Sequence, residues 1–166
     1  MILFSLRSGD GTFSSAPKTR TDAFTQVYTI FGMTNGCMLP LAFALLASKS
    51  ESTYRHLFTV LADLVPNLQP RVFISDFEAS LIPAIAEQFP NTVHHGCFFH
   101  LGQSLWRKVQ DVGLQEAYKT DQDVRQFIKK LTALAFLPPA DVTAAFYDLF
   151  ALAPNDACKE IGFYWR

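Results

Sequence analysis

The chain has few cysteines, no long apolar run and no excess of one charge, and each absence narrows the class of protein. Its three cysteines, Cys37, Cys97 and Cys158, are an odd number without the spacing of a disulfide framework, which favours a reducing compartment. No apolar stretch approaches the roughly 20 residues of a membrane helix, and the apolar start is too short for a signal peptide. We therefore expect a soluble intracellular chain without a membrane partner.

The charge is balanced, with 14 Lys and Arg against 15 Asp and Glu. This balance argues against strong, phosphate-driven DNA binding by this segment alone, because that affinity scales with the number of cationic contacts. A Gly-rich phosphate loop, a Gly-x-Ser-x-Gly elbow and a dinucleotide fingerprint are also missing. We therefore expect no small-molecule cofactor.

What the chain does have is an apolar content of 49% over 166 residues, which suits a compact α/β domain. Two apolar and β-branched runs, 24–31 and 39–46, flank Asn35-Gly36, and this pattern predicts an antiparallel hairpin. Pro40 donates no ladder hydrogen bond, so we expect it near a strand start, at an edge or at a bulge.

The central part predicts alternating helices and strands. Helical spacing over 52–65 is followed by 71–76, a short apolar run that ends in an aspartate and is typical of a buried strand. Residues 77–89 predict a helix that Pro83 starts late or kinks, and 92–98 predict another strand.

The C-terminal part predicts three helices, the second with Thr120 as its N-cap. We therefore expect a single partial domain, with a mixed sheet core in residues 1–100 and a helical region in 101–166. The abrupt aromatic end of the chain is typical of a truncated domain.

Two aspartates are the candidate catalytic residues. Asp10 lies near a candidate first strand and Asp76 ends a later one. Cleavage of phosphodiesters by two metal ions requires converging carboxylates, whose hard oxygen atoms suit Mg²⁺. The alternative is structural: Asp10 belongs to an Asp-Gly turn, and Asp76 caps the following helix. Spacing alone does not decide between them.

A Cys-x-x-His pair, Cys97 and His100, follows His94 and His95, and these are reasonable zinc ligands. Structural zinc usually has two separated pairs of ligands, so a packed cysteine and a hydrogen-bonded histidine remain the alternative. Glu78 is interpreted as favouring the positive N-terminus of the following helix.

Ordered motifs over about 10–150 resemble the transposase domain of Mutator-like elements (MULE), in the RNase H-like DDE superfamily. They are D-G-T-F at Asp10, Phe-x-Gln at Phe24, P-L-A-F-A-L-L at Pro40, F-I-S-D-F-E-A-S at Phe73, G-C-F-F-H-L-G-Q at Gly96 and A-L-A-F-L-P at Ala133.

This resemblance implies an RNase H-like mixed sheet with an antiparallel hairpin edge, parallel strands, flanking helices and a C-terminal helical insertion. It implies that Asp10 and Asp76 are the first two acids of a DDE triad binding Mg²⁺ or Mn²⁺, and that Cys97 and His100 form the associated Cys-x-x-His motif. It further implies DNA as the partner, a transposase oligomer and a nuclear location.

The sequence departs from the family pattern in two places. Arg7, Ser8 and Gly9 replace the apolar strand expected before Asp10, and the third acid is expected beyond Arg166, after the helical insertion. We therefore expect a partial catalytic core, truncated before its final catalytic helix, of an enzyme that cuts DNA and joins the freed 3′-hydroxyl to a target. The alternatives are an inactive or domesticated remnant that binds DNA or protein, and a zinc-binding module.

Overall fold

The computed structural model describes residues 5–12 and 23–165. The chain divides into two compact units, Met1–Cys97 and Phe98–Arg166, and each has its own hydrophobic core. The first unit holds a sheet with two helices, and the second is helical. That both belong to one partial catalytic domain stays a prediction.

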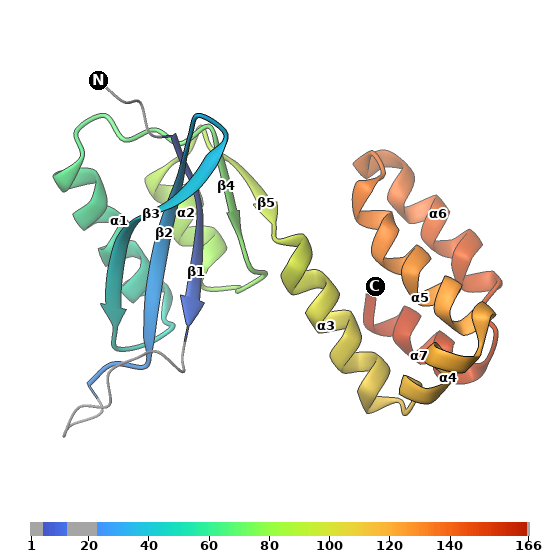
Figure 1. Cartoon of the computed structure of the whole chain (residues 1–166). Coiled ribbons are helices and arrows are strands. Elements are labelled where there is room, and N and C mark those ends of the chain that lie inside the picture. Colours follow the sequence, from blue (N-terminus) through green and yellow to red (C-terminus); the bar gives the residue numbers. More distant parts are fainter. Residues whose placement is uncertain (1–4, 13–22, 166) are drawn as a thin grey trace. The chain divides into compact units, whose positions relative to one another are not determined.

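Within the described part of the first unit, five strands form one mixed sheet in the order β3-β2-β1-β4-β5 (Figure 1). Strands β1, β2 and β3 pair antiparallel, whereas β4 pairs parallel with both β1 and β5. The mixed α/β sheet predicted from the sequence is therefore confirmed. The strands are β1 (Ser5–Thr12), β2 (Gln26–Thr34), β3 (Cys37–Leu46), β4 (Val72–Ser75) and β5 (Val93–Gly96).

The predicted hairpin is formed by β2 and β3. Asn35 and Gly36 have φ angles of 48° and 78°, the positive values that a tight two-residue turn requires. Pro40 lies on edge strand β3 opposite Phe31, where the register shifts between Ile30 and Phe31. The missing N–H of proline is tolerated because this position is both an edge and an irregularity.

The first strand exists although the residues before Asp10 are not apolar. Ser8, Gly9 and Asp10 pair with consecutive residues of β2, and Ser8 pairs with Ile74 of β4. The expectation that Arg7, Ser8 and Gly9 replace this strand is therefore wrong. Its central place between two partners supplies hydrogen bonds on both sides, which outweighs the low strand propensity of glycine.

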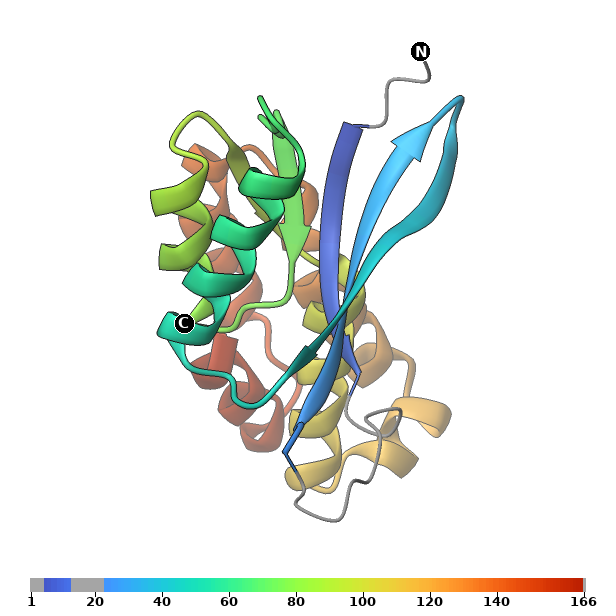
Figure 2. The same ribbon diagram turned by 90° about the vertical axis from the view of Figure 1, so that its left-hand side faces the viewer.

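Two helices, α1 (Glu51–Leu64) and α2 (Leu81–Gln88), cover one face of the sheet (Figure 2). Helix α1 begins where the side chain of Ser50 accepts a hydrogen bond from Thr53 N–H, as an N-cap should. Pro83 lies in the first turn of α2, where its missing N–H costs no helical bond, so the helix starts late and is not kinked.

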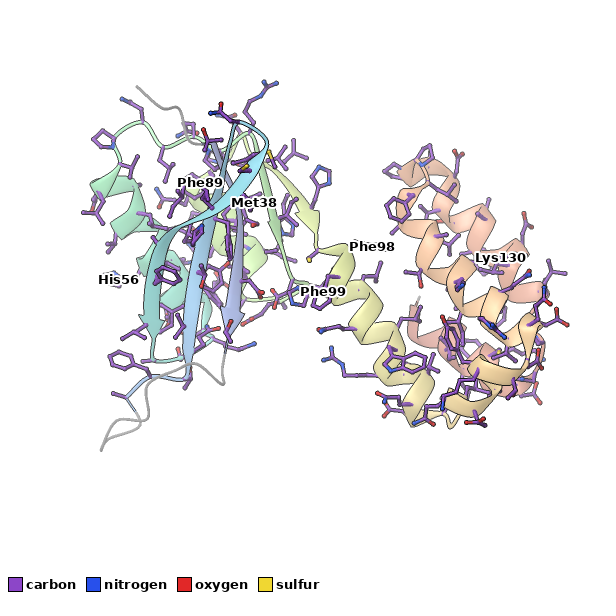
Figure 3. All side chains as sticks on the ribbon, viewed as in Figure 1. Met38, His56, Phe89, Phe98, Phe99 and Lys130 are labelled. Carbon is purple, nitrogen blue, oxygen red and sulfur yellow. The ribbon has the colours of Figure 1, made fainter. Side chains whose placement is uncertain are left out.

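The core of this unit is built around aromatic rings between the helices and the sheet. Phe58 of α1 packs edge to face with Phe73 of β4 and with Phe89, at ring-centroid distances of 5.8 and 5.7 Å. All three rings are fully buried, and Phe89 is marked in Figure 3. These contacts fix both helices on the sheet.

The other face of β3 carries exposed apolar side chains. Leu41, Phe43 and Leu45 are at least 41% exposed and alternate with the inward-facing Ala42 and Ala44. Residues 37–47 include no charged side chain. This strand is also an edge of the sheet, so its outer backbone groups are not in the ladder.

The second unit consists of helices around a separate apolar core. Phe98 and Phe99, both exposed, project from the first turn of α3 in different directions (Figure 3). Its helices are α3 (Phe98–Asp111), α4 (Gln115–Thr120), α5 (Gln122–Ala133), α6 (Pro139–Ala151) and α7 (Asp156–Trp165), with a 3₁₀ turn at Leu134–Phe136. Helices α4 and α7 are absent from the sequence prediction.

The predicted N-cap Thr120 is wrong by one residue. Thr120 ends α4 and its hydroxyl donates to the carbonyl of Glu116, whereas the carboxylate of Asp121 accepts from Asp123 and Val124 N–H at the start of α5. An aspartate serves this position better because one carboxylate accepts two backbone bonds.

In the described part of the chain, no helix is long and apolar enough to cross a membrane.

Truncation of the central aromatic ring tests this packing. Phe58→Ala is expected to lower the free energy of unfolding by about 3–5 kcal/mol, since it leaves a cavity among buried rings. Phe43→Ala, which truncates a ring that is 69% exposed, is the matched control and should change it by about 0.5 kcal/mol or less. Urea denaturation followed by circular dichroism measures both, and equal losses would contradict the assigned core.

Candidate active site

The parallel pairing of β1 with β4 brings the two candidate aspartates together. Ser8 is the register partner of Ile74, so two residues further along both strands Asp10 comes beside Asp76. Neighbouring strands lie about 4.8 Å apart. Asp10 lies within β1 and Asp76 follows the last residue of β4, so this register favours an approach of the two acids at the end of β4.

Neither structural alternative for these aspartates holds. Asp10 lies inside β1, opposite Thr29 of β2, and not in a turn. Asp76 does not cap α2, because that helix begins at Leu81 with Ser80 in the N-cap position. Instead, Asp76 Oδ1 accepts a hydrogen bond of 3.3 Å from the N–H of Glu78 and forms a short turn after β4.

The glycines on either side of Asp10 are required by the neighbouring strand. A Cβ atom on Gly9 would lie 2.3 Å from the hydroxyl of Tyr28, and one on Gly11 would lie 2.2 Å from Gln26 Oε1. Tyr28 and Gln26 are almost completely buried. Only glycine lets β1 approach these side chains while Asp10 projects from the other face of the strand.

The carboxylate of Glu78 contacts side chains, while its main-chain carbonyl accepts hydrogen bonds from the first two N–H groups of α2. Its carboxylate accepts from the hydroxyl of Tyr54, at 3.2 Å to each oxygen, and lies 3.1 Å from Lys49 Nζ. Ser80 Oγ lies 3.0 Å from Glu78 Oε1. These contacts tie the loop after β4 to α1, and a role of Glu78 at the positive N-terminus of α2 stays a prediction.

The two buried tyrosines remain neutral hydroxyl groups. Burial is the main cause that raises the pKa of Tyr28 well above its ordinary value, and electrostatic interactions with Tyr54 and Asp76 raise it further. Asp10 and Glu78 also contribute to raising the pKa of Tyr28. The pKa of Tyr54 is likewise raised, mainly by burial.

The Cys-x-x-His residues fall at the boundary between the two units. Cys97 ends the first unit, where its N–H donates to Ser75 O at 2.7 Å, in register beside Asp76. His100 lies in α3 of the second unit.

Sequence reasoning missed Ser75, whose hydroxyl lies 2.8 Å from His94 Nε2. Burial is the main cause that lowers the pKa of His94, which favours the neutral ring.

The donor atoms at the end of β4 fit a hard divalent cation better than zinc. Asp10 and Asp76 offer carboxylate oxygens, the ligands that Mg²⁺ and Mn²⁺ prefer. Over residues 5–12 and 23–165, no three His, Cys, Asp or Glu side chains form a group arranged to hold a metal ion. The two aspartates alone therefore do not form a metal-binding group among the described residues.

Comparison with family models decides the family. Residues 8–104 match the MULE transposase domain, which is more than half of the chain. The chain belongs to the MULE transposase domain family. The matched range includes Asp10, Asp76, Cys97 and His100, and it ends inside α3. A comparison with curated proteins gave no match.

Membership of the MULE family confirms the resemblance drawn from the ordered motifs. It indicates a transposase-like function and, in general terms, DNA as the partner. The match covers all five strands of the described sheet apart from the first residues of β1.

Substitution of the glycine before Asp10 tests the close approach of β1 and β2 in this MULE domain. Gly9→Ala is expected to lower the free energy of unfolding by about 1–3 kcal/mol, because its methyl group meets the buried ring of Tyr28. Gly102→Ala in α3, where a Cβ meets nothing within 4 Å, should stabilise the chain by up to about 1 kcal/mol. Urea denaturation measures both, and a neutral Gly9→Ala would refute the close approach.

Proposed function

We propose that this chain supplies the front part of the catalytic core of a DNA transposase, with Asp10 and Asp76 as the first two acids of its metal-binding triad. The observation that carries the proposal is the parallel register of β1 and β4, in which Ser8 pairs with Ile74 two residues before each acid. The match to the MULE family over residues 8–104 supports the assignment independently.

We further propose that the fold is RNase H-like. A central β1, with an antiparallel hairpin on one side and parallel strands on the other, supports it. The two acids lie on adjacent parallel strands, near the carboxyl end of β4, where active sites of α/β sheets form. In this proposal the helices of the second unit are the helical insertion of a single partial catalytic domain.

The chemistry requires divalent cations, for which we propose Mg²⁺ or Mn²⁺. Such ions, when bound, activate the attacking oxygen and stabilise the leaving oxygen of a phosphodiester. The chain contributes the carboxylates of Asp10 and Asp76, held by a central strand and by the turn that closes on Glu78 N–H. The third acid is assigned to no residue of this chain.

The proposed substrates are the transposon ends and the target DNA. A net charge of −1 leaves little attraction for phosphates, so this proposal requires that other protein surface contribute to DNA affinity. That surface belongs to further domains or to partner copies in a transposase oligomer. The proposed place of action is the nucleus.

Metal titration tests the proposed acid pair. Asp76→Asn keeps the acceptor for Glu78 N–H but removes one negative charge, so it should weaken Mn²⁺ binding by at least about tenfold, since Mn²⁺ and Mg²⁺ prefer carboxylate ligands. Asp63→Asn changes an exposed acid of α1 and is the matched control, with no expected effect. The loss of the electron paramagnetic resonance signal of free Mn²⁺ on binding measures both, with Mg²⁺ as competitor.

Three outcomes separate the alternatives. Binding of Mn²⁺ that Asp76→Asn weakens and Mg²⁺ displaces supports the proposal. Stoichiometric zinc that is lost on Cys97→Ala, with no Mn²⁺ binding, supports a zinc-binding module instead. Binding of neither ion argues for an inactive or domesticated remnant.

A further inference from the structure

Three buried polar side chains lie between the sheet and α1, and one of them contacts the loop that follows Asp76. They are Gln26 and Tyr28 of β2 and Tyr54 of α1, and we call them the buried polar layer. Each is at most 2% exposed. Packing contacts alone would not require the polar atoms of these side chains. Burying such atoms costs stability unless they are hydrogen-bonded.

Tyr54 is the centre of a directed chain of hydrogen bonds. Gln26 Nε2 donates to the hydroxyl of Tyr54 at 2.9 Å, and this hydroxyl donates its single proton to the carboxylate of Glu78. Because the amide nitrogen of Gln26 can only donate, Tyr54 must accept from it. Its proton is therefore directed toward Glu78.

The chain of hydrogen bonds ends at a proposed metal ligand. Glu78 N–H donates to Asp76 Oδ1, so the position of the Glu78 backbone restrains the orientation of the Asp76 carboxylate. Lys49 Nζ contacts the Glu78 carboxylate from the segment before α1. The loop after β4 is thus attached to α1 and to the segment before it, where Ser80 Oγ also donates to the carbonyl of Lys49.

The same layer also sets the position of β1. The hydroxyl of Tyr28 lies where a Cβ on Gly9 would be, and Gln26 Oε1 lies where a Cβ on Gly11 would be. Neither of these two buried atoms has a hydrogen-bond partner within the described residues. A layer that served stability alone would be better built from apolar side chains of the same shape.

We propose that Tyr54 is a positioning residue of the metal site, which orients the Asp76 carboxylate through Glu78 while Gln26 orients Tyr54. This inference rests on the proposed function, because it assumes that Asp76 binds a divalent cation. Partners that hydrogen-bond to the surroundings of a ligand commonly tune metal affinity by 10–100-fold, since they fix the ligand before the ion arrives.

Tyr54→Phe is the direct test, since it removes the hydroxyl and keeps the buried ring. Mn²⁺ affinity, measured by paramagnetic resonance on the full chain, should fall about tenfold. Phe58→Leu, which alters a fully buried ring one turn along α1 without touching the chain of hydrogen bonds, is the control for a general loss of packing. It should leave Mn²⁺ affinity unchanged.

A second variant and a second readout complete the design. Glu78→Ala removes the carboxylate at the partly exposed end of the chain of hydrogen bonds, so it tests the same link if Tyr54→Phe does not fold. If both single variants fold, the double variant that combines Tyr54→Phe with Glu78→Ala should bind Mn²⁺ no more weakly than Glu78→Ala alone. This is expected because Tyr54 acts through Glu78. Hydrogen exchange of the Glu78 amide, followed by NMR without metal, should accelerate in Tyr54→Phe but not in Phe58→Leu.

The outcomes are distinct. Wild-type Mn²⁺ affinity in Tyr54→Phe, or an equal loss in Phe58→Leu, would overturn the positioning role while leaving the acid pair in place. If the wild-type chain binds no Mn²⁺, the proposed function fails and exchange of the Glu78 amide decides. Faster exchange of the Glu78 amide in Tyr54→Phe alone would still support the attachment of the loop by Tyr54. Unchanged exchange in Tyr54→Phe would overturn that attachment.

Discussion

The pairing of β1 with β4 is the constraint on which the rest of this molecule depends. It joins an antiparallel hairpin to a parallel pair of strands, and its register sets Asp10 beside Asp76. A shift by one residue would send one carboxylate to the opposite face of the sheet, because side chains alternate along a strand. Site and fold are therefore specified by the same hydrogen bonds.

The glycines of the central strand β1 are explained by side chains of the neighbouring strand β2. Gly9 and Gly11 give room to the side chains of Tyr28 and Gln26, and Gln26 in turn meets Tyr54 from the helix layer. The interior near the acids is consequently polar, while the aromatic packing around Phe58 lies elsewhere in the same core. The aromatic packing that stabilises the first unit and the polar contacts near the acids therefore occupy different parts of its core.

Much of the first unit could be predicted from local patterns, because its signals are local. Asn35-Gly36 determines a turn through its own backbone angles, and the apolar run before Asp76 indicates a buried strand by itself. The strand at Asp10 was less visible, since the side chains that justify its glycines come from another strand. The contact of Glu78 with Tyr54 is hidden from local patterns for the same reason, because the two residues are 24 positions apart. In the second unit, the short helix α4 carries no fully buried residue and so leaves little periodic signal.

The hairpin that borders the sheet has a consequence for the behaviour of this unit in solution. Strand β3 presents an open row of backbone groups, with Leu41, Phe43 and Leu45 exposed and no charge from 37 to 47. Uncharged edges of this kind recruit further strands and lead to aggregation. Pro40 interrupts the row, since it offers no N–H to an incoming strand. Pro40 therefore weakens this edge as a template for a further strand.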